Sequence, residues 1–280
     1  IGIALHNYHQ AHNVFPPGGL DYGWAGVGGT EPADKLIKNG NGLVLLLPYL
    51  EQQALFDRYD FRRCASLVKD QQTNIVPSAR DFAGDPVTSG NAAVISQKVP
   101  VFMCPSDPDN LTLPDGSAYG IKAGSGYLAV KTNYDFSARR DDNSYFNDWA
   151  TLGGVTGKRM FGENSATTIA MIVDGTSNTV AVNETLHTVA NGHSPAWGMR
   201  GWVMTGIDLS YGINVTYIPE SYYWVADRRQ LPWRLRDWCA PGSLHPGGMN
   251  IGLADGAVRF LSQTTDMVIL VAISTIAGGE

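Results

Sequence analysis

One histidine and one aspartate near the C-terminal end stand at a spacing that raises the question of shared chemistry. His245 is followed by nine residues and then by Asp255-Gly256. An imidazole and a carboxylate that meet can share a proton or bind a metal ion. Alternating apolar residues predict a strand over residues 249–254, which would separate the two side chains by roughly 20 Å at ~3.4 Å per residue. We therefore expect Asp255-Gly256 to form a turn and His245 to anchor a loop.

Two β-hairpins are predicted, each with Asp-Gly in its turn. Residues 169–173 and 179–184 form the arms of the first hairpin, and residues 249–254 and 257–262 form the arms of the second. If the two hairpins lie side by side and point the same way, their tips bring Asp174 near Asp255. Their bases then bring Glu184 and His187 toward His245. The turn and base residues are Asp174, Gly175, Ser177, Asn178, Glu184, Asp255 and Gly256.

Carboxylates at the turns could ligate a structural cation. Calcium is bound by six to eight oxygen atoms from carboxylates and carbonyls. The candidate ligands are Asp107, Asp109, Asp174 and Asp255. The EF-hand pattern fails at the first two, because Leu111 replaces the third ligand. No motif indicates a cofactor. A structural Ca²⁺ is the one ion that we expect these carboxylates could bind.

Searches for enzyme signatures are negative. The sequence contains no G-x-S-x-G elbow, no H-E-x-x-H helix, no Walker loop and no G-x-G-x-x-G after a strand. Cys64, Cys104 and Cys239 show no metal-ligand spacing, and they leave open one disulfide with a free thiol or three buried thiols. We therefore expect no catalytic residues, with a metal-assisted hydrolase kept as an alternative that needs His245 or His187 beside Glu184, Asp174 or Asp255.

Composition favours a globular, turn-rich protein outside the cytoplasm. Glycine contributes 32 of 280 residues and charged residues only 16%, which favours many turns and loops. The formal net charge of −6 argues against nucleic acid as a partner and against general affinity for anionic lipid.

An aromatic and basic segment lies within residues 190–238, which we interpret as a variable insertion. Exposed, it could stack sugars or bind an acidic polysaccharide or peptide through arginine–carboxylate pairs. Buried, it would form a satellite core, the reading we prefer. The residues concerned are Trp224, Arg228, Trp233, Arg234 and Trp238.

The two ends of the chain are predicted to be helical. Apolar residues at helical spacing predict a helix over residues 1–13, which lacks a capping residue and is expected to continue a longer helix preceded by a membrane segment or signal. A second helix is expected over residues 43–59, bent or begun at Pro48, and a short strand over residues 99–103. A last helix is expected from Asp266 to residues 278–279.

Six blocks of sequence together carry a family resemblance. They are IGIALHNYH with FPPG at residues 1–18, LPYLEQ at 47–52, FMCPSD at 102–107, VDGTSNT at 173–179, SLHPGGMNIGLADGAVRF at 243–260 and AGGE at 277–280. In this order they resemble a bacterial family of uncharacterised proteins with a prepilin-type N-terminus and a C-terminal "His, nine residues, Asp-Gly" motif. The third block contains Cys104, Pro105, Ser106 and Asp107.

The resemblance implies an architecture and a location more than a reaction. It implies an α+β, pilin-like fold in which a truncated N-terminal helix packs on an antiparallel sheet with long loops and a short C-terminal helix. We expect one domain over residues 1–280, held at the cell envelope or surface by a membrane segment outside this sequence. The expected role is structural, with other pilin-like subunits or a second copy binding through the N-terminal helix; a surface module for carbohydrate or peptide is the alternative.

Overall fold

The computed structural model describes residues 1–22, 36–68, 81–108, 110–116, 119–139, 149, 157–190, 193–201, 206–218 and 233–279. Helices and strands are mixed within these ranges, with small and mainly antiparallel sheets, so the expected α+β class is confirmed. None of the described helices combines the length and the apolar character needed to cross a membrane.

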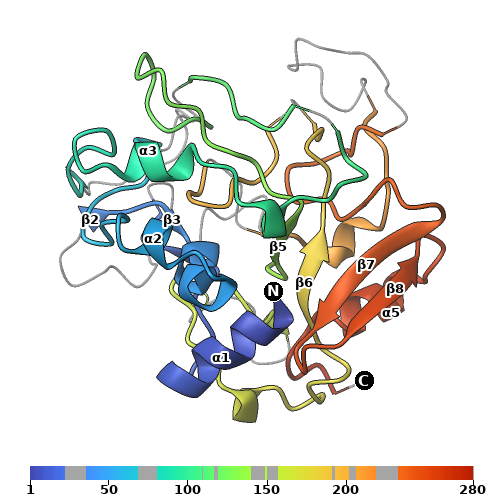
Figure 1. The fold of residues 1–280 in the computed structure, drawn as a ribbon. Helices are drawn as coiled ribbons and strands as arrows, with labels where there is room; N and C mark the ends of the chain where they lie inside the picture. The colour runs from blue at the N-terminus through green and yellow to red at the C-terminus, as the bar shows by residue number, and fades with distance from the viewer. Residues whose placement is uncertain are drawn as a thin grey trace.

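A four-stranded antiparallel sheet forms the right-hand side of the molecule in Figure 1. Its order is β5 (Tyr134–Phe136), β6 (Val180–Glu184), β7 (Gly248–Leu253) and β8 (Val258–Ser262). Two further pairs are short: β1 (Gly19–Leu20) runs antiparallel to β3 (Gly40–Asn41), and β2 (Leu36–Ile37) runs parallel to β4 (Asp81–Phe82).

The second predicted hairpin is confirmed. Strands β7 and β8 pair from Gly248 opposite Ser262 to Gly252 opposite Val258, and Gly256 adopts φ 86° in the turn between them. Glycine reaches this left-handed conformation without the steric cost that a Cβ imposes. The strand separates His245 from Asp255, as expected.

The first predicted hairpin is wrong in one arm. Residues 179–184 contain β6, but residues 169–171 form the 3₁₀ helix η3 (Ile169–Met171). The backbone N–H of Val173 donates to the carbonyl of Ile276 at 2.7 Å, and that of Val180 donates to Ile273 at 2.8 Å. The C-terminal segment therefore supplies the hydrogen bonds that the predicted arm would have made.

The N-terminal helix α1 (Gly2–His12) is confirmed and ends at Asn13, which has a left-handed φ of 60°. In Figure 1 it lies beneath the nine-residue 3₁₀ helix η1 (Gly42–Leu50), against which it packs. Its first turn also approaches the β7–β8 turn: a Cβ on Gly2 would stand 3.0 Å from the carbonyl oxygen of Gly256.

The helix expected over residues 43–59 is divided in two. The apolar stripe is buried as predicted, but it belongs to η1, and the α-helix α2 (Gln53–Phe56) follows separately. Pro48 lies inside η1, where it lacks an N–H and would collide with the carbonyl four residues earlier in an α-helix. Glu51 then ends η1 with a left-handed φ of 59°.

The strand expected over residues 99–103 is also wrong, because the 3₁₀ helix η2 (Pro100–Phe102) occupies it. Pro100 fixes a φ suited to the first position of a helical turn and cannot donate to a sheet. Two further short helices are α3 (Asn91–Ile95) and η4 (Leu209–Tyr211).

The last helix covers one face of the sheet. Helix α5 (Met267–Ala272) begins at Asp266, whose carboxylate accepts the N–H of Val268 at 2.8 Å, as predicted. It ends at Ala272 and not at residues 278–279. Its Leu270 packs with Met249, Ile251 and Leu253 of β7 in one apolar cluster.

A buried ion pair ties the start of the chain to the sheet. The Arg200 guanidinium donates to both carboxylate oxygens of Asp135 on β5 and to the carbonyl of Gly18, with all of these groups buried. Burial alone would lower the pKa of Arg200, but Asp135 and Tyr22 raise it above its usual value. The guanidinium therefore stays charged.

We expect Arg200→Met to lower the free energy of unfolding by about 3–5 kcal/mol, because it leaves the Asp135 carboxylate buried without a counter-charge. Urea denaturation measures the change. Arg62→Met is the matched control, since Arg62 forms an exposed ion pair with Asp60 and should change stability by no more than about 0.5 kcal/mol. Equal effects of the two substitutions would show that the buried pair contributes little.

Candidate functional site

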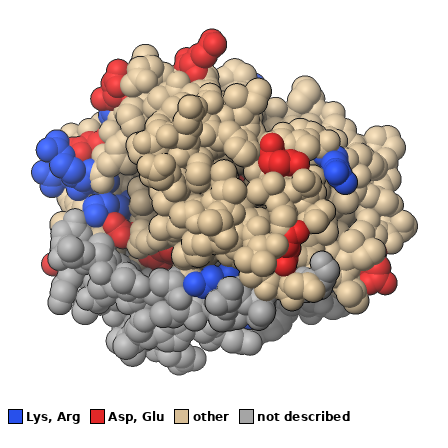
Figure 2. All heavy atoms as spheres, turned by 90° about the horizontal axis from the view of Figure 1, so that it is seen from below, with Lys and Arg blue, Asp and Glu red and all other residues tan. Residues whose placement is uncertain are grey.

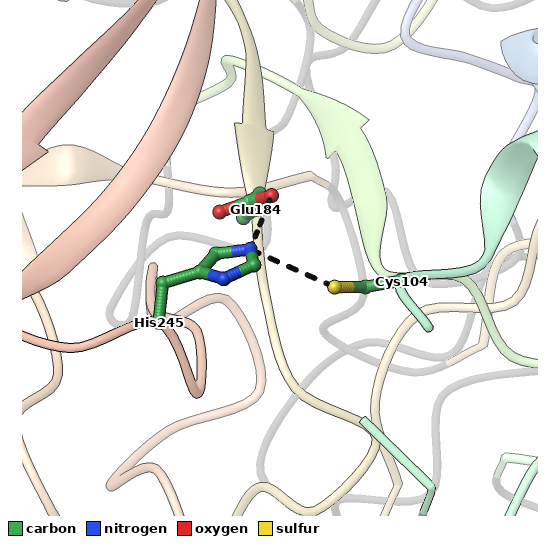
Figure 3. Close-up of side chains that lie close together, drawn as sticks. All are labelled: Cys104, Glu184 and His245. Atoms are coloured by element: carbon green, nitrogen blue, oxygen red, sulfur yellow. Dashed lines mark hydrogen bonds and ion pairs between the residues drawn. The ribbon is translucent and has the colours of Figure 1, made fainter. Parts of the chain in front are cut away.

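Three side chains that could ligate a metal converge at one end of β6. The Nε2 atom of His245 lies 3.6 Å from Oε1 of Glu184 and 3.8 Å from Sγ of Cys104, as Figure 3 shows. All three ligand atoms lie within 4.8 Å of one another. Within the described ranges this is the one group of three His, Cys, Asp or Glu side chains with such a geometry.

Glu184 is fixed by the pairing of β6 with β7. It is the last residue of β6, and Asn183 stands opposite Ile251. Its Oε2 accepts the backbone N–H of Asn250 at 2.6 Å, and the Asn250 side-chain amide lies 3.3 Å from Oε1. The predicted approach of Glu184 to His245 is confirmed, and the carboxylate is held with Oε1 toward the imidazole.

His245 is held by the loop that precedes β7. Its backbone N–H donates to the hydroxyl of Ser243 at 3.1 Å, and that hydroxyl donates to the carbonyl of Gly248 at 2.7 Å. Gly247 has φ 81° at the bend. The side chain is 30% exposed, while those of Cys104 and Glu184 are buried. The imidazole is thus the part of the site that solvent reaches.

Cys104 is held by a network of buried polar groups. Its backbone N–H donates to the Asn133 side-chain carbonyl at 2.8 Å, and the Asn133 amide donates to Oδ2 of Asp107 at 2.8 Å. The same Oδ2 accepts the backbone N–H of His187 at 2.7 Å. Asp107 therefore anchors the turn that presents the Cys104 thiol, and His187 is part of that anchor.

Tyr134 completes the surroundings of the site. Burial first, and then the neighbouring Cys104 and Glu184 side chains, raise the pKa of Tyr134. The phenol therefore stays protonated.

A cleft of about 540 Å³ lies beside the site. Tyr134, Glu184 and Asn250 line it, and Leu5 of α1 borders it.

A second hollow of about 510 Å³ is lined by Cys104 and Asp107. Met103 borders both hollows, so the residue before Cys104 lies between them. Cys104 thus borders the second hollow and Glu184 borders the cleft, while the imidazole of His245 is partly exposed to solvent.

Two of the other predicted ligands accept hydrogen bonds from backbone N–H groups. Asp174 accepts the backbone N–H groups of Gly278 at 2.7 Å and Gly279 at 2.9 Å, and Asp255 accepts that of Ala257 at 2.9 Å. The two turns do meet, because the N–H of Asp255 donates to the carbonyl of Thr176 at 3.1 Å. Asp109 lies outside the described residues. A structural Ca²⁺ at these carboxylates stays a prediction.

The remaining residues of these turns also have local roles. The Asn178 side-chain amide donates to the carbonyl of Asp174 at 3.0 Å, and Gly175 has φ 94°. Cys64, Cys104 and Cys239 are free and buried, which decides between the two cysteine arrangements left open by the sequence.

The aromatic segment is buried where it is described. Trp238 and Arg234 are buried, with the Arg234 guanidinium 4.0 Å from the centre of the Tyr217 ring and its Nε donating to the carbonyl of Ala190. Trp233 is exposed, and Trp224 and Arg228 lie outside the described residues. The preferred reading of a satellite core is confirmed for Trp238, which packs with Leu186, Val189, Ala190, Leu235 and Ala240.

No local pattern joins Cys104 to His245, since 141 positions separate them. Cys104 and Glu184 were singled out only as residues of family blocks or hairpin ends, and Tyr134 and Asn250 were missed. The one available signal was the presence of Cys104 and His245 in separate blocks of the same resemblance.

The comparisons with known proteins give a family and no function. A family model described as "Protein of unknown function (DUF1559)" matches residues 1–268. The chain belongs to this family. A search of curated proteins and a search of solved structures each found no match. The DUF1559 match spans α1, the sheet and all three side chains of the site.

We expect Asp107→Ala to lower the free energy of unfolding by about 2–5 kcal/mol, because it leaves the buried Asn133 amide and the His187 N–H without this acceptor. Denaturation in urea is the measurement. The control is Asp115→Ala, which removes an exposed acceptor of two loop N–H groups and should cost less than about 1 kcal/mol. A small effect at Asp107 would mean that the turn of Cys104 is held by other contacts.

We expect His193 to make the fold acid-sensitive. Burial, and secondarily Lys131, lower the pKa of His193 from 6.5 to about 4. Below pH 6.5 the unfolded chain takes up this proton first, so stability should fall by about 2–3 kcal/mol as the pH drops toward 4. His193→Gln should flatten this part of the stability profile measured from pH 8 to pH 4. Parallel profiles for both proteins would contradict the assignment.

Proposed function

We propose that this chain is the non-enzymatic, extracytoplasmic head of a membrane-anchored, pilin-like protein with a structural or assembly role. The family resemblance supports this, and one observation carries it: an apolar surface where α1 meets the edge of the sheet. This surface, termed the α1–β8 surface, consists of Ile3, Val258 and Phe260, which are 78%, 72% and 52% exposed.

The α1–β8 surface draws on two elements that lie next to each other. Gly2 touches the β7–β8 turn at Gly256, and α1 and Val258 border the same cleft. Val258 and Phe260 stand opposite Gly252 and Asn250, so they share one face of the sheet. Exposed apolar groups gathered in this way are typical of a surface that binds another protein.

The side of the molecule on which α1 lies carries few charges. Figure 2 views this side from below, and charged side chains are sparse over its described part. A weakly charged face with apolar residues favours association with another subunit, because few charged groups must lose their hydration. We propose that the partner is a second copy or another pilin-like subunit, bound through α1 and β8.

Two alternatives have different support. A metal-assisted hydrolase is favoured by the contact of His245 with Glu184, the approach that this chemistry requires. A carbohydrate- or peptide-binding module would depend on Trp233, since Trp238 and Arg234 are buried.

We expect the full-length protein, expressed with its native N-terminus, to form filaments or ordered oligomers that electron microscopy detects. Val258→Glu should abolish them, because a carboxylate in the contact would lose its hydration. Val268→Glu is the matched control: Val268 is 76% exposed, but it lies on α5, which packs on the opposite face of the sheet. Unassembled monomers of the unmodified protein, or equal loss with both substitutions, would overturn the proposal.

A further inference from the structure

We infer that Cys104, Glu184 and His245 form a Zn²⁺ site with three protein ligands and an open fourth position. The ligand atoms are Sγ, Oε1 and Nε2. Metal binding by these three side chains requires neither subunit assembly nor hydrolysis.

The separation of the ligand atoms fits one tetrahedral ion. Bonds of about 2.3 Å to sulfur and about 2.0–2.1 Å to nitrogen or oxygen, at a tetrahedral angle, separate sulfur from nitrogen by about 3.6 Å and nitrogen from oxygen by about 3.4 Å. The corresponding distances here are 3.8 Å from Cys104 to His245 and 3.6 Å from His245 to Glu184. The third pair, the thiol of Cys104 and the carboxylate of Glu184, lies within 4.8 Å. Side-chain adjustments of about 1 Å or less would therefore bring all three atoms to bonding distance.

The direction of approach distinguishes a metal site from a cysteine protease-like triad. In a nucleophile–histidine–acid triad the nucleophile and the acid contact opposite nitrogens of the imidazole, so that one positions the ring and the other exchanges a proton. Here the thiol and the carboxylate both face Nε2 of His245 (Figure 3). Three ligand atoms that point to a common centre are the arrangement of a coordination site.

The ligand chemistry selects zinc over calcium. A thiolate and an imidazole are preferred by zinc and other thiophilic ions, whereas calcium and magnesium require oxygen ligands. Only one carboxylate is present, and its second oxygen accepts the N–H of Asn250. Three protein ligands with an open position are the pattern of zinc sites that bind water or a small molecule.

Tyr134 and Asn250 act as positioning residues. Tyr134 interacts electrostatically with the Cys104 and Glu184 side chains, and the backbone N–H of Asn250 donates to Oε2 of Glu184. Such partners orient metal ligands, and their loss commonly weakens binding by about 10–100-fold. The carboxylate of Glu184 is therefore positioned by Asn250 before any ion binds.

The test is calorimetric titration of the chelator-treated, reduced 280-residue chain with Zn²⁺, paired with Co²⁺ absorption spectroscopy. We expect one ion per chain and a thiolate-to-Co²⁺ charge-transfer band. Cys104→Ser should abolish the band, and Glu184→Gln and His245→Gln should weaken Zn²⁺ binding by more than about 100-fold, beyond the range for positioning residues. Tyr134→Phe should weaken it less than these ligand substitutions.

The matched controls are Cys64→Ser, Glu51→Gln and His12→Gln, which change the same residue types elsewhere in the chain. They should leave the affinity and the band unchanged. If Cys104→Ser fails to fold, as judged by circular dichroism, His245→Gln decides the matter, because His245 is partly exposed in a loop. Absence of stoichiometric Zn²⁺ binding, or equal weakening by ligand and control substitutions, would overturn the inference.

Discussion

The pairing of β6 with β7 is the constraint on which the remaining structure depends. Every residue of β6 is buried, so its backbone polar groups must be satisfied by neighbouring strands. The register with β7 sends Ile251 and Leu253 into the cluster under α5 and leaves Asn250 and Gly252 on the cleft side. The same register places the carboxylate of Glu184 against Asn250. One set of backbone hydrogen bonds therefore fixes both a core and the site beside it.

Local signals explain what could be predicted from the sequence. The β7–β8 hairpin follows from alternating apolar residues around Asp255-Gly256, and the start of α5 follows from Asp266. Helix α1 follows from its apolar spacing. Glu184 could be brought near His245 because Glu184 ends one predicted hairpin arm and His245 lies just before another. These features need information from only a few neighbouring residues.

The features that escaped prediction depend on distant partners or on proline. Residues 169–173 are not a strand because Ile276 pairs with Val173, a hundred positions away. Pro48 and Pro100 convert apolar runs into 3₁₀ helices. Cys104 reaches the site because Asn133 and Asp107 hold its turn, and no spacing along the chain reveals that contact. The site is built by tertiary packing, whereas its hairpin is built by local sequence.

The spacing between His245 and Asp255 is set by the length of strand β7. It spans a loop anchored by Ser243, the whole of β7, and the turn that touches Gly2 of α1. Because side chains alternate along a strand, one inserted or deleted residue in β7 would exchange its two faces or displace one end by about 3.3 Å. Met249, Ile251 and Leu253 would leave their cluster, or His245 would leave Glu184. The nine intervening residues therefore set the distance between two contacts. His245 meets Glu184 at one end, and the turn of Asp255-Gly256 meets Thr176 and Gly2 at the other.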